Sequence, residues 1–361
     1  MALHKTKRAT SADVARLAGV SQTTVSFVIN NVASANISPE TRTRVLEAIE
    51  QLNYVPHEAA RTLGRKASKI LGIAIPDPFN AHYQQTVAGT TDYARRYGYN
   101  TFVTGTNYDV ENERLALQWL RQQRYDALIL MAGTDQLELD RRLVVAEGYP
   151  IIGIGIVDTN LDCVDTEPET GERAVLEHLA ALGHRSIGYI YGTANQRLFN
   201  KRLETCLRIQ QEMGLPIDER FIRRCGTTMQ DGYDATRAFV QDTSAAELPT
   251  ALIVVNDLLA QGTLAALHRC GIAVPNEMSV CSFDNVESSA FTIPALTTVE
   301  SHAVRRGEEA ARLALARLAQ PQSPPMSITV PTKLIVRDST GPARITPIEA
   351  AVSAPPSDEG L

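Results

Sequence analysis

The chain has 361 residues, which favours more than one domain because single hydrophobic cores rarely grow beyond about 250–300 residues. Its composition, 44% hydrophobic and 21% charged with a net charge of −6, is typical of a soluble globular protein. No apolar run reaches the roughly 20 residues that a membrane helix needs, and the first residues lack the apolar core and cleavage site of a signal peptide. We therefore expect a cytoplasmic location and no membrane partner.

The charge is unevenly distributed along the chain. Residues 1–70 contain ten Lys or Arg and five Asp or Glu, a net charge of +5, so the remainder carries −11. A basic segment attached to an acidic body suggests that the segment binds a polyanion. A basic surface helix without a ligand is the alternative, and charge alone does not decide between the two.

The first predicted element is a short helix that follows Thr10. Thr10-Ser-Ala-Asp13 has the spacing of a capping box, in which the Thr hydroxyl and the Asp carboxylate bind the first free amides of a helix. Gly19 ends the helix, because a residue without a Cβ adopts the left-handed conformation of a helix C-terminus. The inward face is expected to contain Val14, Leu17 and Ala18.

Two further helices follow. Ser21 can cap a second helix from Gln22 to about Asn30, and Ser38-Pro39-Glu40 has the residue types that begin a third. A helix, a turn of about four residues with a glycine, and a second helix form the helix-turn-helix signature. Apolar residues at helical spacing predict the core: Val25, Val28 and Ile29 on the second helix, and Val45, Ala48, Ile49 and Leu52 on the third.

The second helix has a polar outer face. Its N-terminal and outward residues are Ser21, Gln22, Thr23, Ser26 and Phe27. In a helix-turn-helix the second helix enters the DNA major groove N-terminus first, where Gln22 can pair with adenine and Thr23 can contact several bases. A solvated polar face is the commoner explanation for such a pattern by itself, but the basic charge and the Gly19 turn favour DNA.

Longer motifs carry a resemblance to a known family. DVARLAGVSQTTVSFVINN, followed by SPETRTRVLEAIEQLNYVPHEAARTL, resembles the N-terminal domain of the lactose-repressor (LacI/GalR) family of bacterial transcription regulators. The resemblance implies that Gln22 and Thr23 read bases, that Ser21 and Thr24 contact phosphate, and that the protein is nucleoid-associated. The complete set of expected DNA-binding residues is Thr10, Ser21, Gln22, Thr23, Thr24, Ser26, Phe27, Asn30, Ala60, Arg61 and Leu63.

The same resemblance assigns His57 to about Gly64 as a hinge helix that is ordered only when two heads meet on DNA. Leu63 would insert into the minor groove and open a central base step, although an ordinary packing role is the alternative. Two residues depart from the family pattern. Phe27 stands where many members have Arg, and His57 stands where Asn is usual.

From Lys69 onward, short continuous apolar runs alternate with amphipathic segments. Such runs are typical of parallel strands that are buried on both faces, and repeated strand–helix units predict a doubly wound α/β fold. Because the runs extend over about 270 residues, we expect two similar lobes with a ligand cleft at the carboxyl ends of the strands. The predicted strands are Ile70–Ile75, Thr101–Thr104, Ala127–Met131, Ile151–Ile156, Ile187–Tyr191, Leu252–Val255 and Val280–Phe283.

Motifs for catalysis and cofactors are absent from the sequence. No GxGxxG follows the first strand, and neither GxxxxGK[ST] nor GxSxG occurs. The five cysteines show no CxxC spacing, so we expect reduced thiols, no metal and no cofactor. An enzyme remains a weak alternative, with Asp77, Asp257 and Asp284 as acids and His82 as a base. A sugar-binding transport component is another, but it leaves residues 1–65 unexplained.

The body also resembles the effector domain that lactose-type repressors share with periplasmic sugar-binding proteins, through IPDPFNAHY, VVNDLLAQG, VPNEMSVCSFDN, IPALTTV and PTKLIVRDST. The resemblance implies a small-molecule effector, by default a sugar or related polyol, with a nucleoside as an alternative. Thr227 occupies a place where members of the family often have a bulky aromatic residue, and Ser301 one where Gln or another polar residue is common. The expected effector-binding residues are His82, Tyr83, Arg202, Thr227, Asn256, Asp284 and Ser301.

These observations predict four regions: a helix-turn-helix domain at 1–56, a hinge helix and linker at 57–68, a two-lobed effector-binding and dimerisation domain at 69–340, and a disordered tail at 341–361. The chain is expected to cross between lobes near Val157–Asn160, Asn285–Pro294 and Gln320–Pro325, where turn-forming residues gather. The tail lacks a heptad repeat, so we expect a homodimer that binds a pseudo-palindromic DNA operator.

Overall fold

The computed structural model describes residues 9–29, 35–54, 67–122, 124–132, 134–156, 158–167, 169–192, 196–346 and 348. The chain forms two compact units, Met1–Ser68 and Lys69–Leu361, which we call the head and the body. Within the described ranges, no helix is both long and apolar enough to cross a membrane. The predicted hinge helix with His57, Ala60, Arg61 and Leu63, and the predicted contact of Asn30, lie outside the described residues.

The head is a three-helix unit, and its helices begin and end close to the predicted residues. They are α1 Ser11–Ala18, α2 Gln22–Ile29 and α3 Pro39–Gln51. The small core consists of Val14, Ala15, Ala18, Val25, Val28, Val45 and Ala48. The inward assignment of Leu17 is wrong, since its side chain is 47% exposed and Ala15 is buried instead. Because the Ala15 side chain is short, α1 can pack closely against α2 and α3.

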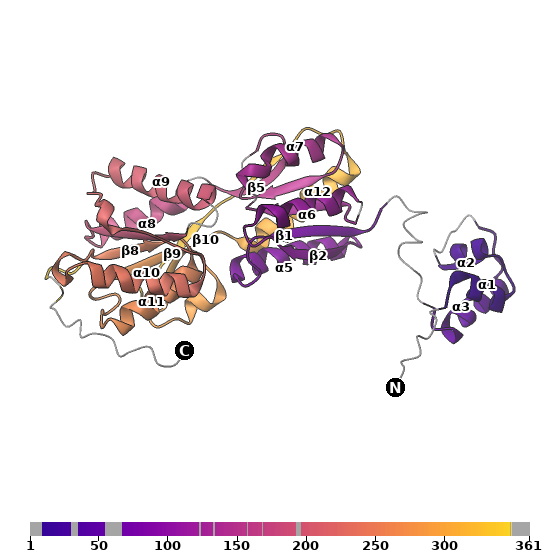
Figure 1. The fold of residues 1–361 in the computed structure, drawn as a ribbon, viewed down its shortest axis with the longest axis horizontal. Coiled ribbons are helices and arrows are strands. Elements are labelled where there is room, and N and C mark those ends of the chain that lie inside the picture. The colour runs from indigo at the N-terminus through magenta and orange to yellow at the C-terminus, as the bar shows by residue number, and fades with distance from the viewer. Residues whose placement is uncertain are drawn as a thin grey trace. The chain divides into compact units, whose positions relative to one another are not determined.

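The first lobe of the body has a six-stranded, all-parallel sheet in the order β11-β5-β4-β3-β1-β2. Its strands are β1 Ile70–Ile75, β2 Asn100–Gly105, β3 Ala127–Met131, β4 Ile151–Ile154, β5 Asp162–Thr166 and β11 Ser327–Val330. The helices are α5 Ala81–Arg96, α6 Val110–Arg121, η1 Asp135–Leu137, α7 Glu138–Ala146 and α12 Ala303–Ala319. Helices α5 and α12 pack on one face of the sheet, and α6 and α7 pack on the other (Figure 1).

The second lobe repeats this architecture with the order β12-β10-β9-β8-β6-β7, in which only the β10–β12 pair is antiparallel. Its strands are β6 Ile187–Gly192, β7 Ile222–Cys225, β8 Ala251–Val254, β9 Ser279–Asp284, β10 Thr297–Glu300 and β12 Lys333–Ile335. The helices are α8 Thr170–Ala181, α9 Gln196–Glu212, η2 Glu219–Phe221, α10 Met229–Asp242, η3 Ala245–Glu247, α11 Asp257–Arg269 and η4 Glu287–Ala290. The predicted two-lobed α/β fold is therefore confirmed.

Helices α5 and α12 approach each other closely because each has a glycine at the contact. A Cβ on Gly89 would lie 2.0 Å from the Val304 carbonyl oxygen, and a Cβ on Gly307 would lie 2.0 Å from that of Thr86. Since real side chains never approach a backbone atom so closely, any larger residue would force the helices apart. This contact sets the positions of two elements that line the cavity described below.

The chain passes between the lobes at other places than predicted. It crosses between β5 and α8, between β10 and α12 and between β11 and β12. The turn-rich segments proposed as crossings instead connect β4 to β5, β9 to β10 and α12 to β11 within one lobe, because the same residue types form ordinary turns.

Residues 341–344, which were predicted to belong to a disordered tail, make hydrogen bonds to the second lobe, whereas residues 349–361 of that predicted tail lie outside the described residues. The Gly341 amide donates to Ser279 Oγ at 3.0 Å, and the Ala343 amide donates to the Leu182 carbonyl at 2.9 Å. Arg344 donates to the Pro249 carbonyl at 2.9 Å and also to the carbonyl of Leu248. Composition predicted disorder here, but these backbone and guanidinium hydrogen bonds hold the segment against the second lobe.

Candidate functional site

The structure presents one face of α2 to solvent. Gly19 adopts the left-handed conformation with φ 67°, and Ser21 then caps the helix by accepting a hydrogen bond from the Thr24 amide at 3.1 Å. Thr24 is half-buried and its hydroxyl lies 2.9 Å from that of Ser21. The side chains of Ser21, Gln22, Thr23, Ser26 and Phe27 are all exposed, as the sequence predicted.

Thr10 has a structural role in the head. Its hydroxyl accepts from the Asp13 amide at 3.3 Å, while its own amide donates to the Asp13 carboxylate at 2.9 Å. These hydrogen bonds form the predicted capping box, and those from Thr10 lower the pKa of Asp13. A predicted DNA contact of Thr10 would therefore use a hydroxyl that also caps α1.

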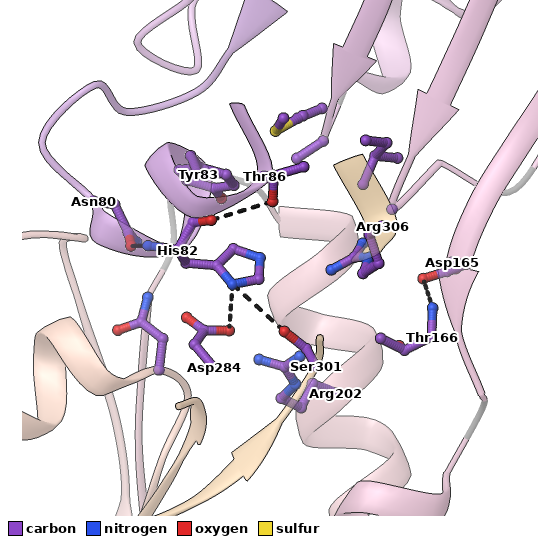
Figure 2. A pocket seen from close by; sticks show the side chains of 15 residues that line it. Asn80, His82, Tyr83, Thr86, Asp165, Thr166, Arg202, Asp284, Ser301 and Arg306 are labelled. Atoms are coloured by element: carbon purple, nitrogen blue, oxygen red, sulfur yellow. Dashed lines mark hydrogen bonds and ion pairs between the residues drawn. The ribbon is translucent and has the colours of Figure 1, made fainter. Parts of the chain in front are cut away.

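The second candidate site is a small cavity at the carboxyl ends of both sheets that is partly open to solvent (Figure 2). Six of the seven predicted effector residues line it: His82, Tyr83, Arg202, Asn256, Asp284 and Ser301. Thr227 is not in the lining, because it follows β7, which is the edge strand of its sheet. The structure therefore brings together residues that are more than 200 positions apart.

The side of the cavity formed by the first lobe begins with a helix N-terminus. Asn80 caps α5 by accepting from the His82 amide at 2.9 Å, which leaves its amide nitrogen able to donate. His82 Nδ1 lies 3.5 Å from Asp284 Oδ1 and 3.5 Å from Ser301 Oγ. The rings of His82 and Tyr83 meet edge to face with centroids 5.4 Å apart.

The side formed by the second lobe repeats the strand–Asn–helix arrangement. Asn256 caps α11 by accepting from the Leu259 amide at 2.9 Å, so its amide nitrogen also remains able to donate. Arg202, on α9, donates to the Val255 carbonyl at 2.7 Å and has its Nε 3.5 Å from Glu172. The Arg202 guanidinium is thus held in place by protein groups.

Burial controls the protonation of His82 and Asp284. It lowers the pKa of His82 to about 3, an effect that the charges of Arg306 and Arg202 strengthen. Burial also raises the pKa of Asp284 to about 7, although the same two arginines oppose the shift. Near neutral pH the imidazole is uncharged and Asp284 exchanges a proton. The pair can therefore both donate hydrogen bonds to ligand hydroxyls and accept hydrogen bonds from them.

Several lining residues escaped the sequence prediction: Asn80, Thr86, Asp165, Thr166 and Arg306, together with the less polar Met131, Ala132, Ile154 and Gly155. Asn80 has a weaker sequence signal than Asn256, because it lies in the loop after a predicted strand, five residues beyond the strand end. Arg306 has none, since it belongs to an amphipathic helix in which charged residues usually face water.

Asp257, which the enzyme hypothesis included, has a structural role. It is fully buried and lies outside the cavity lining. Its carboxylate accepts hydrogen bonds from the Val286 amide at 2.9 Å, from the hydroxyls of Ser289 and Thr298 at 2.6 Å each, and from that of Ser282. These bonds fix the loops after β9 beside Asp284.

A helix-turn-helix head joined to a two-lobed body with a polar interlobe cavity defines the class of ligand-responsive DNA-binding proteins. The comparisons identify the family. The model of "Bacterial regulatory proteins, lacI family" matches residues 10–57, and that of the periplasmic binding protein-like domain matches residues 176–340. The chain belongs to the LacI family of bacterial transcription regulators.

A curated relative covers almost the whole chain. The HTH-type transcriptional repressor PurR of Haemophilus influenzae (strain PittEE) is 31% identical over 342 residues, which cover 92% of this chain and 98% of the relative. The chain is accordingly a DNA-binding transcription repressor, and the enzyme alternative is set aside.

Solved structures show the same fold. The lac repressor dimer bound to operator and the anti-inducer ONPF is 28% identical with a TM-score of 0.80, and the match covers 93% of this chain and 100% of that one. The transcriptional regulator CelR in complex with cellobiose is 26% identical with a TM-score of 0.68, covering 92% and 100%.

Proposed function

We propose that the protein acts in the cytoplasm, at the nucleoid, where a homodimer binds a pseudo-palindromic operator under the control of a sugar or related polyol in the body cavity. A two-fold dimer presents two identical heads, so the operator it fits has two related half-sites. Regulators of similar fold include a complex with operator and a complex with cellobiose, which supports both parts of the proposal.

In the head, Gln22 and Thr23 read base edges, while Ser21 and Thr24 contact phosphate. The exposure of Gln22, Thr23, Ser26 and Phe27 on consecutive turns of α2 supports this assignment. Phe27, 38% exposed, supplies an apolar surface that suits a thymine methyl group rather than a phosphate. The contacts of Asn30, Ala60, Arg61 and Leu63 are proposed from the family resemblance.

The effector part of the proposal rests on one contact between the two lobes. His82 Nδ1 of the first lobe and Asp284 Oδ1 of the second lobe lie 3.5 Å apart across the cavity. A ligand that hydrogen-bonds both sides changes the free energy of one lobe arrangement relative to another. Such differential affinity is what a ligand needs to shift a two-state equilibrium. Tyr83, Arg202, Asn256 and Ser301 complete the polar lining, and Thr227 would act only from outside it.

The test is selection of binding sites from a random duplex library with the purified full chain at near-physiological salt. We expect an enriched pseudo-palindrome and a steep loss of affinity with salt, because phosphate contacts release counterions. Gln22→Ala and Phe27→Ala should each relax one half-site position, whereas Leu46→Ala, an exposed change on α3, should leave the site unaltered. If no site is enriched even with pooled metabolites present, the proposal is wrong.

A further inference from the structure

Among the described residues, one cation in the cavity lacks an acidic partner such as the buried Arg141 and the half-buried Arg317 have. Arg306, on α12, is 7% exposed, and its Nε is buried without a hydrogen-bond partner. Within the part of the chain that the structure describes, its guanidinium makes no hydrogen bond or ion pair. By contrast, Arg141 contacts Glu113 at 2.6 Å and Arg317 contacts Asp162 at 2.8 Å.

The position of Arg306 is imposed by the packing of its helix. The glycine contacts between α5 and α12 hold the backbone of α12, and Gly307 directly follows Arg306. Its Nη2 lies 3.8 Å from where a Cβ of Gly155 would be, so the guanidinium extends over the end of β4. In Figure 2 the Arg306 side chain lies between His82 and Asp165, in the interior of the pocket.

The nearest carboxylates attract Arg306 from a distance but do not contact it. Asp165 and Asp284 both favour the charged form of Arg306, whereas burial lowers its pKa. Asp165 accepts a hydrogen bond from the Thr166 amide at 2.8 Å, and Asp284 faces His82. A buried charge without hydrogen-bond partners is costly, so the site is incomplete as it stands.

We propose that Arg306 binds an oxyanion of the effector, a carboxylate or a phosphate ester, while the hydroxyl groups of the same molecule meet Asp284 and Asn256 of the second lobe. The effector is thus an acidic sugar derivative rather than a neutral sugar. The planar guanidinium offers paired donors that match either oxyanion. This inference rests on the proposed effector function and specifies the chemical class of the ligand.

The experiment uses the full-length protein and a named ligand pool. The neutral members of the pool are D-glucose, D-galactose, D-ribose and cellobiose. The acidic members are D-gluconate, D-glucuronate, D-galacturonate, D-glucose 6-phosphate and D-ribose 5-phosphate. All are added at equal concentration to a protein-free bacterial extract. Compounds retained after rapid gel filtration are identified by mass spectrometry, and their affinities are measured by calorimetry. The variants are Arg306→Gln and Arg306→Lys, with Arg305→Gln as the matched control, an exposed arginine on the same helix.

We expect wild type and Arg305→Gln to retain an acidic compound, and Arg306→Gln to bind it about 10- to 100-fold more weakly, the loss of a hydrogen-bonded charge pair. Arg306→Lys should keep more affinity for a phosphate than for a carboxylate, which separates the two sources of the anion. A neutral compound retained equally by wild type and Arg306→Gln would overturn the inference and leave the effector function intact. Retention of nothing by wild type would overturn both.

A stability measurement keeps the inference testable if a variant misfolds. In the absence of ligand, Arg306→Gln should melt at or above the wild-type temperature, because it removes a buried charge that has no partner. Arg141→Gln, which breaks a buried ion pair, should melt well below it. A loss of thermal stability in Arg306→Gln as large as that in Arg141→Gln would show that Arg306 is a structural residue.

Discussion

His82 and Asp284 form a buried pair. Removing the carboxyl and removing the imidazole should shift the pH dependence of stability in opposite directions. The pKa of Asp284 is raised to about 7, so between about pH 4 and 7 the native state binds a proton that the unfolded state releases. This contribution to stability is lost as the pH rises. The pKa of His82 is lowered to about 3, so its contribution is lost as the pH falls through about 6.5 to 3.

In the wild type the two effects oppose each other between about pH 4 and 6.5. Each corresponds to at most about 1.4 kcal/mol per pH unit in the free energy of unfolding, or about 3 kcal/mol across this window. Asp284→Asn removes the carboxyl effect of this pair, so the stability of this variant should rise more with pH than that of the wild type. His82→Gln removes the histidine effect, so its stability should fall more with pH than that of the wild type.

The assay is urea unfolding followed by far-UV circular dichroism at a series of pH values in this window. His268→Gln, at an exposed position on α11, serves as the control and should follow the wild type. Side-chain NMR of His82 should in addition show a neutral ring at pH 5. If both variants have the same pH slope, or if the His82 ring is protonated at pH 5, the assignment of protons to this pair is wrong.

Three further predictions concern packing and DNA binding. Asp257→Asn should lower the free energy of unfolding by about 2–5 kcal/mol, because an amide nitrogen cannot accept two of the hydrogen bonds in the buried cluster; a urea midpoint equal to wild type would contradict this. Gly307→Ala should cost about 1–3 kcal/mol in the same assay and weaken ligand retention, since its Cβ would overlap the Thr86 carbonyl. Leu63→Ala should weaken operator binding in fluorescence anisotropy while sparing non-specific DNA, and equal loss of both would refute the proposed wedge.

The central strands were predictable because their sequences satisfy one physical condition. ILGIAI of β1 and ALILM of β3 are continuous apolar runs, and both strands have the predicted bounds because both faces of each are covered by helices. Five strands were missed: β5, β7, β10, β11 and β12. At the edges, IRRC of β7, SITV of β11 and KLI of β12 carry polar or half-exposed residues that an edge permits. The interior strands β5 and β10, DCVDT and TTVE, were missed because they are short and contain several polar residues. Their strand form depends on neighbours that are distant in sequence.

The site was partly predictable for a similar reason. Asn256 and Asp284 follow apolar strands, and parallel strands bring their carboxyl ends to one edge of a sheet. Arg306 could not be found this way, because its burial results from the glycine contact between two helices that are more than 200 residues apart. Thr227 was predicted to bind the effector, but it follows β7 at the edge of its sheet and lies outside the cavity lining.

The central claim is that a ligand in the body cavity changes the affinity of the head for its operator. The most direct test is fluorescence anisotropy of the selected operator with wild type and Asp284→Asn, each with and without the compound that the wild type retains. We predict a change of about 5- to 150-fold in the operator affinity of the wild type and little change in the variant. A compound that binds the wild-type cavity but leaves its operator affinity unchanged would contradict the account.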